Sequence, residues 1–182
     1  MADDFSRLVS LACHDIRTPL ATVQGFAKTM LRMDELDEEK RMRYLGLIDN
    51  SADELVSLLD LLSLAARIEG GRYEPVVREV DSLELAPDGA AGGGATVRVD
   101  PEPVERALAS IRRAASRHGG VEVAVSVDGP HVSFEPVTAE AAPVVLGEDA
   151  KDLGAAVAIR LVRSLGGDVA LDGERLTVTL PS

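Results

Sequence analysis

Two lines of apolar residues with heptad spacing constrain the fold of this chain more than any other feature. Over residues 4–31, and again over residues 37–68, apolar residues recur at alternating steps of three and four. The first line is Val9, Ala12, Ile16, Pro19, Val23, Phe26 and Met30, and the second is Leu45, Ile48, Ala52, Leu55, Leu59, Leu62 and Ala66. Such spacing is typical of helices that pack against other helices. We therefore expect two long helices in the first 70 residues.

Polar residues and glycines predict where these helices begin and end. A polar break covers residues 32–37, and Asp37 followed by Glu38 and Glu39 indicates a capped helix start with acidic residues in its first turn. The pair Gly70-Gly71 indicates the end of the second helix. A single hairpin leaves part of its apolar surface uncovered, whereas two copies can form a four-helix bundle. We therefore predict a homodimer with twofold symmetry.

One histidine faces away from the apolar line of the first helix. His14 lies midway between Ala12 and Ile16, about 200° round the helix from each, so its side chain is expected to face solvent. Asp15 follows it directly, and Thr18 shares its face four residues on. A solvent-facing imidazole can attack a phosphoryl group through one ring nitrogen while a neighbouring carboxylate holds the proton on the other. The pattern predicts a phosphoacceptor histidine with Asp15 as its acid–base partner.

Three neighbouring residues bear on this site. Thr18 is placed to position a water for hydrolysis of a phosphoryl group on a partner. Pro19 removes one helical hydrogen bond and loosens the helix just beyond the site. Arg17 either contacts phosphate or an acidic partner, or is an ordinary surface arginine.

After residue 71 the pattern changes to short alternating segments separated by glycine turns. The expected strands are residues 95–99, 121–127, 131–134, 168–171 and 175–180, and the expected helices are residues 101–118 and 151–165. Residues 88–95 hold four glycines and three alanines but no lysine, which favours a flexible loop over a phosphate-binding loop. A second loop is expected at residues 135–150. The sum is an antiparallel sheet covered by helices, an α+β sandwich.

Composition narrows the class of protein. The chain has 182 residues and a formal charge of −12, so the phosphates of nucleic acids repel it. Cys13 is the single cysteine, which excludes an internal disulfide or a cysteine metal cluster and fits a reducing compartment. We see neither a signal peptide nor an apolar run long enough to span a membrane. The expected protein is cytoplasmic, without nucleic-acid or membrane partners.

The segment His14-Asp15-Ile16-Arg17-Thr18-Pro19-Leu20 resembles the H-box of two-component sensor histidine kinases. The similarity continues through residues 44–45, 48, 51–52 and 55 to residues 67–71, which resemble the end of the second helix of the family's dimerisation and phosphotransfer domain. The resemblance implies that His14 is the phosphorylated histidine and Asp15 the adjacent acid–base residue. It also implies that Asp15 and Thr18 together support dephosphorylation of a response-regulator receiver domain.

The second half resembles the family's ATP-binding domain, a Bergerat-type (GHKL) α/β sandwich, through residues 153–159 and 165–167. The family's Mg²⁺-holding asparagines align with Ser110 and Ala114, and alanine offers no oxygen ligand to magnesium. Its adenine-reading Asp-x-Gly falls near residues 135–137, which lack the glycine, and residues 137–149 are short for an ATP lid. Gly154 keeps the first glycine of the last box, whereas Ala156 replaces the second. We interpret this domain as degenerate, with neither a nucleotide nor a metal cofactor.

The sequence therefore predicts an α+β protein with a helical-hairpin phosphotransfer domain over residues 1–70 and a degenerate ATPase-like domain over residues 71–182. The favoured function is a histidine phosphotransferase of a bacterial phosphorelay, which moves phosphoryl groups between receiver aspartates through His14, with Mg²⁺ in the partner receiver. Three alternatives stay open. They are an ATP-dependent sensor kinase with a divergent nucleotide site, a receiver phosphatase, and a non-catalytic dimeric adaptor.

Overall fold

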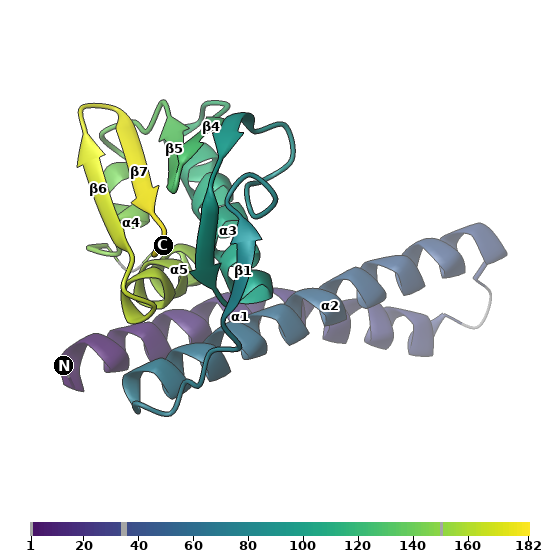
Figure 1. Ribbon diagram of the computed structural model, residues 1–182. Coiled ribbons are helices and arrows are strands. Elements are labelled where there is room, and N and C mark those ends of the chain that lie inside the picture. The colour runs from purple at the N-terminus through teal and green to yellow at the C-terminus, as the bar shows by residue number, and fades with distance from the viewer. Residues whose placement is uncertain (1, 34–35, 150) are drawn as a thin grey trace. The chain divides into compact units, whose positions relative to one another are not determined.

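The protein folds as two compact units along the chain. A computed structural model describes residues 2–33, 36–149 and 151–182, and the side chains from residue 5 onward within these ranges. Unit 1 is Met1–Ser63 and unit 2 is Leu64–Ser182. The division lies within the second long helix. Figure 1 shows the helices and strands of both units.

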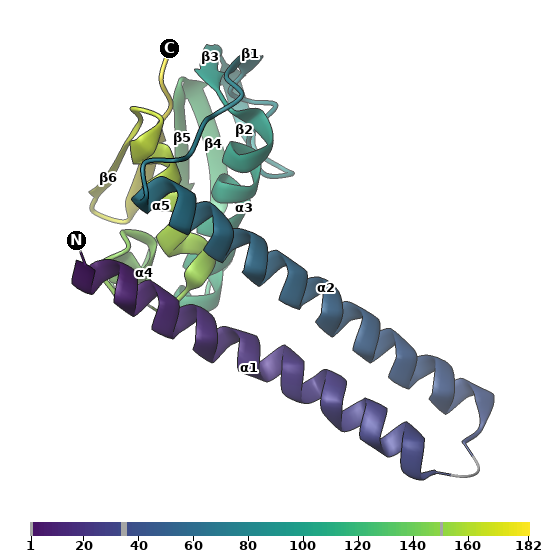
Figure 2. The same ribbon diagram turned by 90° about the horizontal axis from the view of Figure 1, so that it is seen from below.

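Unit 1 is the predicted helical hairpin. Helix α1 spans Ala2–Arg32 and continues through Pro19, and helix α2 spans Glu38–Glu69. The two helices run antiparallel (Figure 2). Two residues of the predicted polar break, Asp34 and Glu35, lie outside the described residues.

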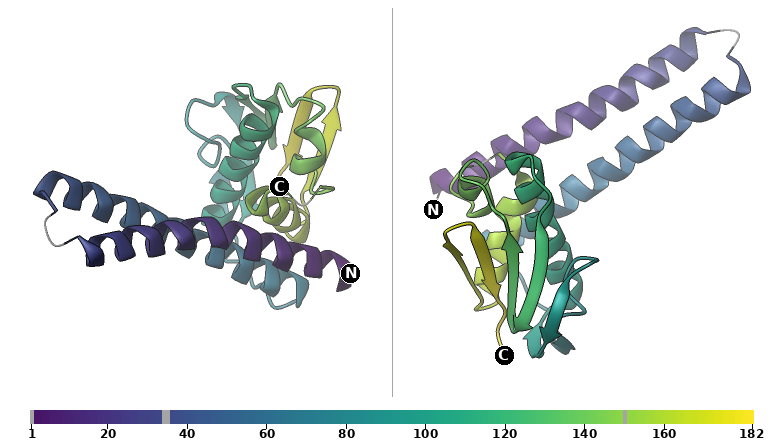
Figure 3. Two further views of the ribbon diagram at one scale, coloured as in Figure 1. Left: turned by 180° about the vertical axis from the view of Figure 1, so that it is seen from behind. Right: turned by 90° about the horizontal axis from the view of Figure 1, so that it is seen from above.

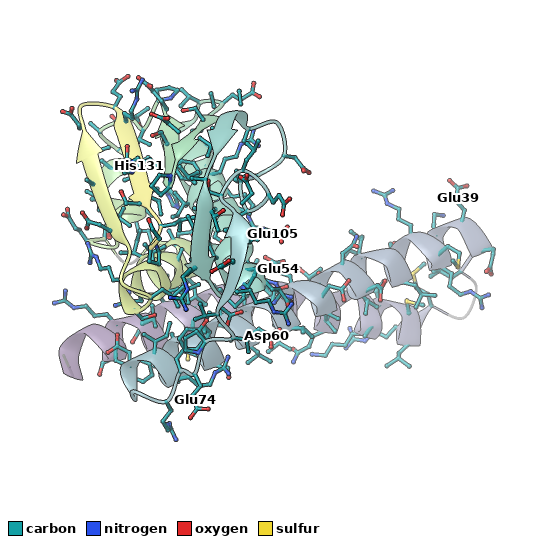
Figure 4. All side chains as sticks on the ribbon, in the orientation of Figure 1. Glu39, Glu54, Asp60, Glu74, Glu105 and His131 are labelled. Carbon is teal, nitrogen blue, oxygen red and sulfur yellow. The ribbon has the colours of Figure 1, made fainter. Side chains whose placement is uncertain are left out.

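Asp37 caps α2 as predicted. Its Oδ1 accepts a hydrogen bond from the backbone N–H of Lys40 at 2.8 Å, and its Oδ2 lies 2.9 Å from the Lys40 ammonium. The Lys40 N–H, followed by the Lys40 side chain, lowers the pKa of the Asp37 carboxyl. Figure 4 labels Glu39 at this end of α2, where an acidic residue in the first turn complements the helix dipole.

Only half of the apolar line on α2 is covered within one chain. Ile48, Leu55 and Leu62, seven residues apart, are half-buried, and Tyr44 stacks at a tilt on Phe26 of α1 with ring centroids 5.0 Å apart. The other heptad position, occupied by Leu45, Ala52 and Leu59, is exposed. Leu45 is 44% and Leu59 is 54% exposed. The hairpin therefore presents a line of uncovered apolar residues along α2.

Unit 2 contains two sheets and three helices among the described residues. A two-stranded antiparallel sheet pairs β1 (Arg78–Asp81) with β3 (Thr96–Val99). The five-stranded sheet has the order β2-β4-β5-β7-β6. Its strands are β2 (Ala91–Gly94), β4 (Ala124–Gly129), β5 (His131–Glu135), β6 (Asp168–Asp172) and β7 (Arg175–Thr179). The helices are α3 (Pro101–Gly119), α4 (Ala142–Val145) and α5 (Leu153–Ser164).

The core of unit 2 lies between the five-stranded sheet and helices α3 and α5, which cover the same face of that sheet (Figure 3). Alternate residues of β4, β5 and β7 point into it, among them Val125, Phe134 and Val178. The residues between them are exposed or half-buried, and Figure 4 labels one, His131 on β5. This alternation confirms the predicted α+β sandwich and shows in addition that one sheet face is open to solvent.

Two predictions for unit 2 are wrong. Residues 88–95 are not a flexible loop, because residues 91–94 form strand β2, which pairs in parallel with β4. The sheet is consequently mixed rather than wholly antiparallel. The segment expected to be a loop at residues 135–150 contains the short helix α4, and Ala141, Val144 and Val145 are buried. In both segments tertiary packing overrides the local turn signals of glycine, proline and alanine.

The last turn of α2 belongs to unit 2. Leu64, Ile68 and Tyr73 pack against the core of that unit. The Glu69 carboxylate accepts a hydrogen bond from Nε of Arg160 on α5 at 3.1 Å. The Tyr73 hydroxyl donates to Oδ2 of Asp100 at 2.9 Å, and the same oxygen accepts the backbone N–H of Val76. These contacts hold the end of α2 and the segment after it against the N-terminus of α3 and the side of α5.

Candidate functional site

The centre of the candidate site is an exposed histidine on the outer face of α1. The His14 side chain is 77% exposed, which agrees with the orientation predicted from the heptad line. Its Nδ1 lies 3.2 Å from Oδ1 of Asp15, whose side chain is 28% exposed. Because the carboxylate accepts only, this contact favours the tautomer with the proton on Nδ1. That tautomer leaves the Nε2 lone pair free toward solvent.

Pro19 changes the helix just beyond this pair. Having no N–H, Pro19 gives no helical hydrogen bond to the backbone carbonyl of Asp15, four residues before it. Helix α1 nevertheless runs on unbroken to Arg32. His14 and Asp15 therefore lie in a turn of an unbroken helix that lacks one backbone hydrogen bond.

A shallow groove runs along α1 from this turn. Its volume is about 650 Å³, and its lining residues are Arg17, Thr18, Ala21, Thr22, Gly25, Phe26 and Thr29. Most of them are small, so a partner can approach the helix backbone closely. Thr22 and Thr29 direct their hydroxyls to the backbone carbonyls of Thr18 and Gly25 at 3.2 and 2.8 Å. The sequence predictions named Arg17 and Thr18 but missed the rest of the groove. The available signal is the spacing of Thr18, Thr22 and Thr29, four and then seven residues apart, which places them on one helix face.

The residues at the positions expected to hold Mg²⁺ in ATP-binding relatives face the protein interior. Ser110 and Ala114 lie on α3 and are 5% and 0% exposed. The Ser110 hydroxyl accepts a hydrogen bond from the Arg113 guanidinium at 3.1 Å. Ala114 contributes no polar side-chain atom. These side chains do not fit an octahedral Mg²⁺, which needs several accessible oxygen ligands.

The glycine at the start of α5 is used for helix packing. A Cβ added at Gly154 would lie 3.1 Å from Cβ and 3.2 Å from Oγ of Ser110. Helices α3 and α5 therefore meet at this point, where the glycine of an ATP-binding relative is expected to face phosphate. Ala156, at the next glycine position, is 3% exposed.

A carboxylate occupies the N-terminus of α5. Asp152 is 12% exposed, and its Oδ1 accepts the backbone N–H of Ala155 at 3.0 Å. Its Oδ2 lies 3.5 Å from Nη1 of Arg117 and 3.7 Å from Nε2 of His118. The sequence predictions did not single out this cap, although an aspartate directly before an apolar helical pattern is a usual N-cap signal.

The remaining nucleotide-related segment is also packed. Val137 is 1% exposed, and its backbone N–H donates to the Glu174 carbonyl at 2.7 Å. Residues 142–145 form helix α4, in which Val144 and Val145 are buried. Position 137 therefore holds a buried valine where the relatives' adenine-reading glycine is expected.

Comparison with known proteins identifies the hairpin. Residues 6–71 match the model of the His Kinase A (phospho-acceptor) domain, which covers the H-box and both helices. An uncharacterized sensor-like histidine kinase of Rhizobium meliloti is 30% identical over 74 residues, 40% of this chain and 14% of its own length. The sensor protein kinase PmrB of Pseudomonas aeruginosa is 33% identical over 82 residues, 45% of this chain and 17% of its own length.

Two further proteins are similar over nearly the whole chain. The sensor protein EvgS of Escherichia coli K12 is 20% identical over 97% of this chain and 19% of its own length. The histidine kinase AdeS of Acinetobacter baumannii has a similar fold, with a TM-score of 0.63 at 17% identity over 92% of this chain and 97% of that structure. This chain thus spans less than a fifth of the length of each of these three sensor proteins.

Residues 6–71 thus match a HisKA-type phospho-acceptor domain, and this part of the chain is similar to sensor histidine kinases. The chain as a whole has a fold like that of a histidine kinase. Among the helices of the described residues, none is both long and apolar enough to cross a membrane.

Proposed function

We propose that the protein is a histidine phosphotransferase of a two-component phosphorelay, which carries phosphoryl groups between receiver-domain aspartates without using ATP. The observation that carries the proposal is the exposed His14 with its Nδ1 beside the Asp15 carboxylate. The domain match supports the phosphoacceptor role of the hairpin. The packed residues at the nucleotide positions of unit 2 support a phosphate source other than ATP.

The geometry suggests how the transfer proceeds. Asp15 keeps the proton on Nδ1, so the free Nε2 attacks the phosphorus of a receiver aspartyl phosphate. A new N–P bond forms while the O–P bond breaks, and the receiver carboxylate leaves with the electron pair. Bound in the receiver, Mg²⁺ would neutralise charge on the phosphoryl oxygens. The same steps in reverse pass the group to a second receiver.

The groove on α1 is the proposed place where the receiver docks. It begins at Arg17 and Thr18, one turn from His14, so a partner seated in it brings its phosphoaspartate toward the imidazole. Arg17 is exposed and can pair with a carboxylate or a phosphoryl oxygen of the receiver.

We propose that the active form is a homodimer. The exposed line of Leu45, Ala52 and Leu59 on α2 keeps heptad spacing, which two hairpins can cover by packing into one four-helix bundle. His14 belongs to the opposite face of α1 from its own heptad line, so it stays accessible in such a bundle.

A receiver phosphatase is the second candidate function, and the exposure of Thr18 one turn from His14 favours it. A hydroxyl at that place can orient a water for attack on the receiver's aspartyl phosphate. This reaction needs Asp15 and Thr18 but does not pass through phosphohistidine.

One set of variants separates the two functions. The protein is mixed with a radiolabelled phosphorylated receiver, and label on the protein and phosphate released from the receiver are both measured. Phosphotransfer predicts acid-labile label that disappears in His14→Ala and forms roughly 100-fold more slowly in Asp15→Asn. Phosphatase activity predicts phosphate release that survives His14→Ala but falls in Thr18→Ala. Ser57→Ala, which removes an exposed hydroxyl of α2 outside the groove, is the control. A folded, dimeric wild type that never carries label contradicts the phosphotransferase.

A further inference from the structure

The start of α5 is the place in unit 2 where the phosphates of a nucleotide are expected in ATP-binding relatives. In this chain the carboxylate of Asp152 lies there. The free N–H groups and dipole of a helix N-terminus favour an anion. Here the Asp152 carboxylate, 12% exposed, accepts the Ala155 N–H with one oxygen. An external phosphate at this place would meet a carboxylate already in position.

Two basic side chains lie near the second carboxylate oxygen of Asp152. The guanidinium of Arg117 lies 3.5 Å from Oδ2, and Nε2 of His118 lies 3.7 Å from it. That histidine nitrogen is buried without a hydrogen-bond partner among the described residues. Arg117, His118 and the N–H groups at the start of α5 are groups of the kind that bind a phosphate, and here they face the Asp152 carboxylate.

The contact between the two helices closes the same place from the other side. At Gly154 the backbone of α5 approaches Ser110 so closely that a Cβ would lie 3.1 Å from the Ser110 Cβ. The neighbouring Ala114 is fully buried. Helices α3 and α5 are therefore in direct contact at this point.

We propose that Asp152 is a built-in anion that takes the place of nucleotide phosphate at the α5 N-terminus. Its carboxylate accepts the Ala155 N–H and faces Arg117 and His118 of α3, so it fixes α5 on α3, and unit 2 keeps its fold and stability without a nucleotide. The site is filled by the chain itself rather than left as a weakened ATP site. This inference rests on the proposed ATP-independent function and adds the residue that makes the domain independent of nucleotide.

The test is to remove the charge while keeping the helix cap. Serine is also a good N-cap, so Asp152→Ser retains the hydrogen bond to Ala155 and vacates the anion position. Melting temperatures of the full chain are compared in potassium phosphate and in potassium chloride of equal ionic strength. If the vacated position binds phosphate with a dissociation constant of about 5 mM, about 50 mM phosphate raises the melting temperature of Asp152→Ser by roughly 3–8 °C.

Three controls accompany this variant. Wild type shows no difference between the buffers and no rise with Mg-ADP. Asp168→Ser removes an exposed carboxylate of β6 instead, and it also shows no difference. Adding Arg117→Gln to Asp152→Ser removes most of the phosphate effect.

Each contrary result overturns the inference. These are an equal response of Asp152→Ser and Asp168→Ser to phosphate, a wild type stabilised by phosphate or Mg-ADP, or an Asp152→Ser chain that folds in neither buffer. The proposed function fails separately, when wild-type His14 takes no phosphate from a receiver. Because Asp152 lies outside the hairpin, Asp152→Ser that folds is expected to accept receiver phosphate on His14 at the wild-type rate.

Discussion

Strand β2 can be tested by replacing one glycine at a time, beginning with Gly92. Gly92 has a φ of 127°, and a Cβ there would lie 2.0 Å from the carbonyl oxygen of Val127 on β4. The positive φ costs an L-residue about 1–3 kcal/mol, and relieving the overlap typically costs about 1–3 kcal/mol more. We therefore expect Gly92→Ala to destabilise unit 2 by roughly 2–6 kcal/mol and to lower its melting temperature by roughly 8–20 °C.

Gly93 is the matched control, since no atom lies within 4 Å of a Cβ added there and its φ is not positive. Gly93→Ala is expected to change stability by no more than about 0.5 kcal/mol. Calorimetry of the full chain gives the melting temperature, and hydrogen exchange of peptides from β4 shows whether its pairing with β2 is lost. If both variants melt with the wild type, residues 91–94 are the flexible loop that their composition suggests, and the paired strand is refuted.

Three other outcomes are expected. Burial and then the hydrogen bond to Asp100 raise the pKa of the Tyr73 hydroxyl, so its stabilising contribution is complete below about pH 10 and is lost as the pH rises through the raised pKa. Ultraviolet titration of wild type against Tyr73→Phe measures this, and a Tyr73 midpoint near 10 contradicts it. Leu59→Glu is expected to weaken the dimer roughly 10²–10⁴-fold in sedimentation, because each copy loses the burial of a leucine. Ser57→Glu, on the outer face of α2, is the control, and equal dimer content in both variants argues against the proposed interface. Gly154→Val is expected to destabilise unit 2 by about 1–3 kcal/mol, because its side chain would crowd Ser110 on α3. Urea unfolding measures this loss. A variant as stable as the wild type would mean that α3 and α5 are not closely packed there.

The hairpin was predictable from sequence because its signals are local and repeat many times. Seven apolar residues in each helix define the helical period. Asp37 marks the start of α2 through a hydrogen bond to a residue only three positions along the chain. The same period fixed the face of His14 and its contact with Asp15. Periodicity did not show which heptad position of α2 is covered within one chain, because this depends on the tilt and separation of two helices.

Unit 2 was less predictable because its pairings join distant segments. The glycines of β2 read as a loop, and only the parallel partner β4, more than thirty residues away, makes them a strand. The role of Gly154 depends on Ser110 of another helix, and that of Asp152 on Arg117 and His118. The family resemblance indicated which nucleotide-binding positions are replaced in this chain. The side chains that pack at these positions could be identified only in the folded structure.

The most direct test of the account is where the phosphate on His14 comes from. Wild type and His14→Ala are incubated in parallel with radiolabelled Mg-ATP alone and with a radiolabelled phosphorylated receiver, and acid-labile label on the protein is counted. We predict label on wild type from the receiver, no label from ATP, and none on His14→Ala from either source. Label on wild-type His14 from ATP alone would contradict the account and establish an ATP-dependent kinase.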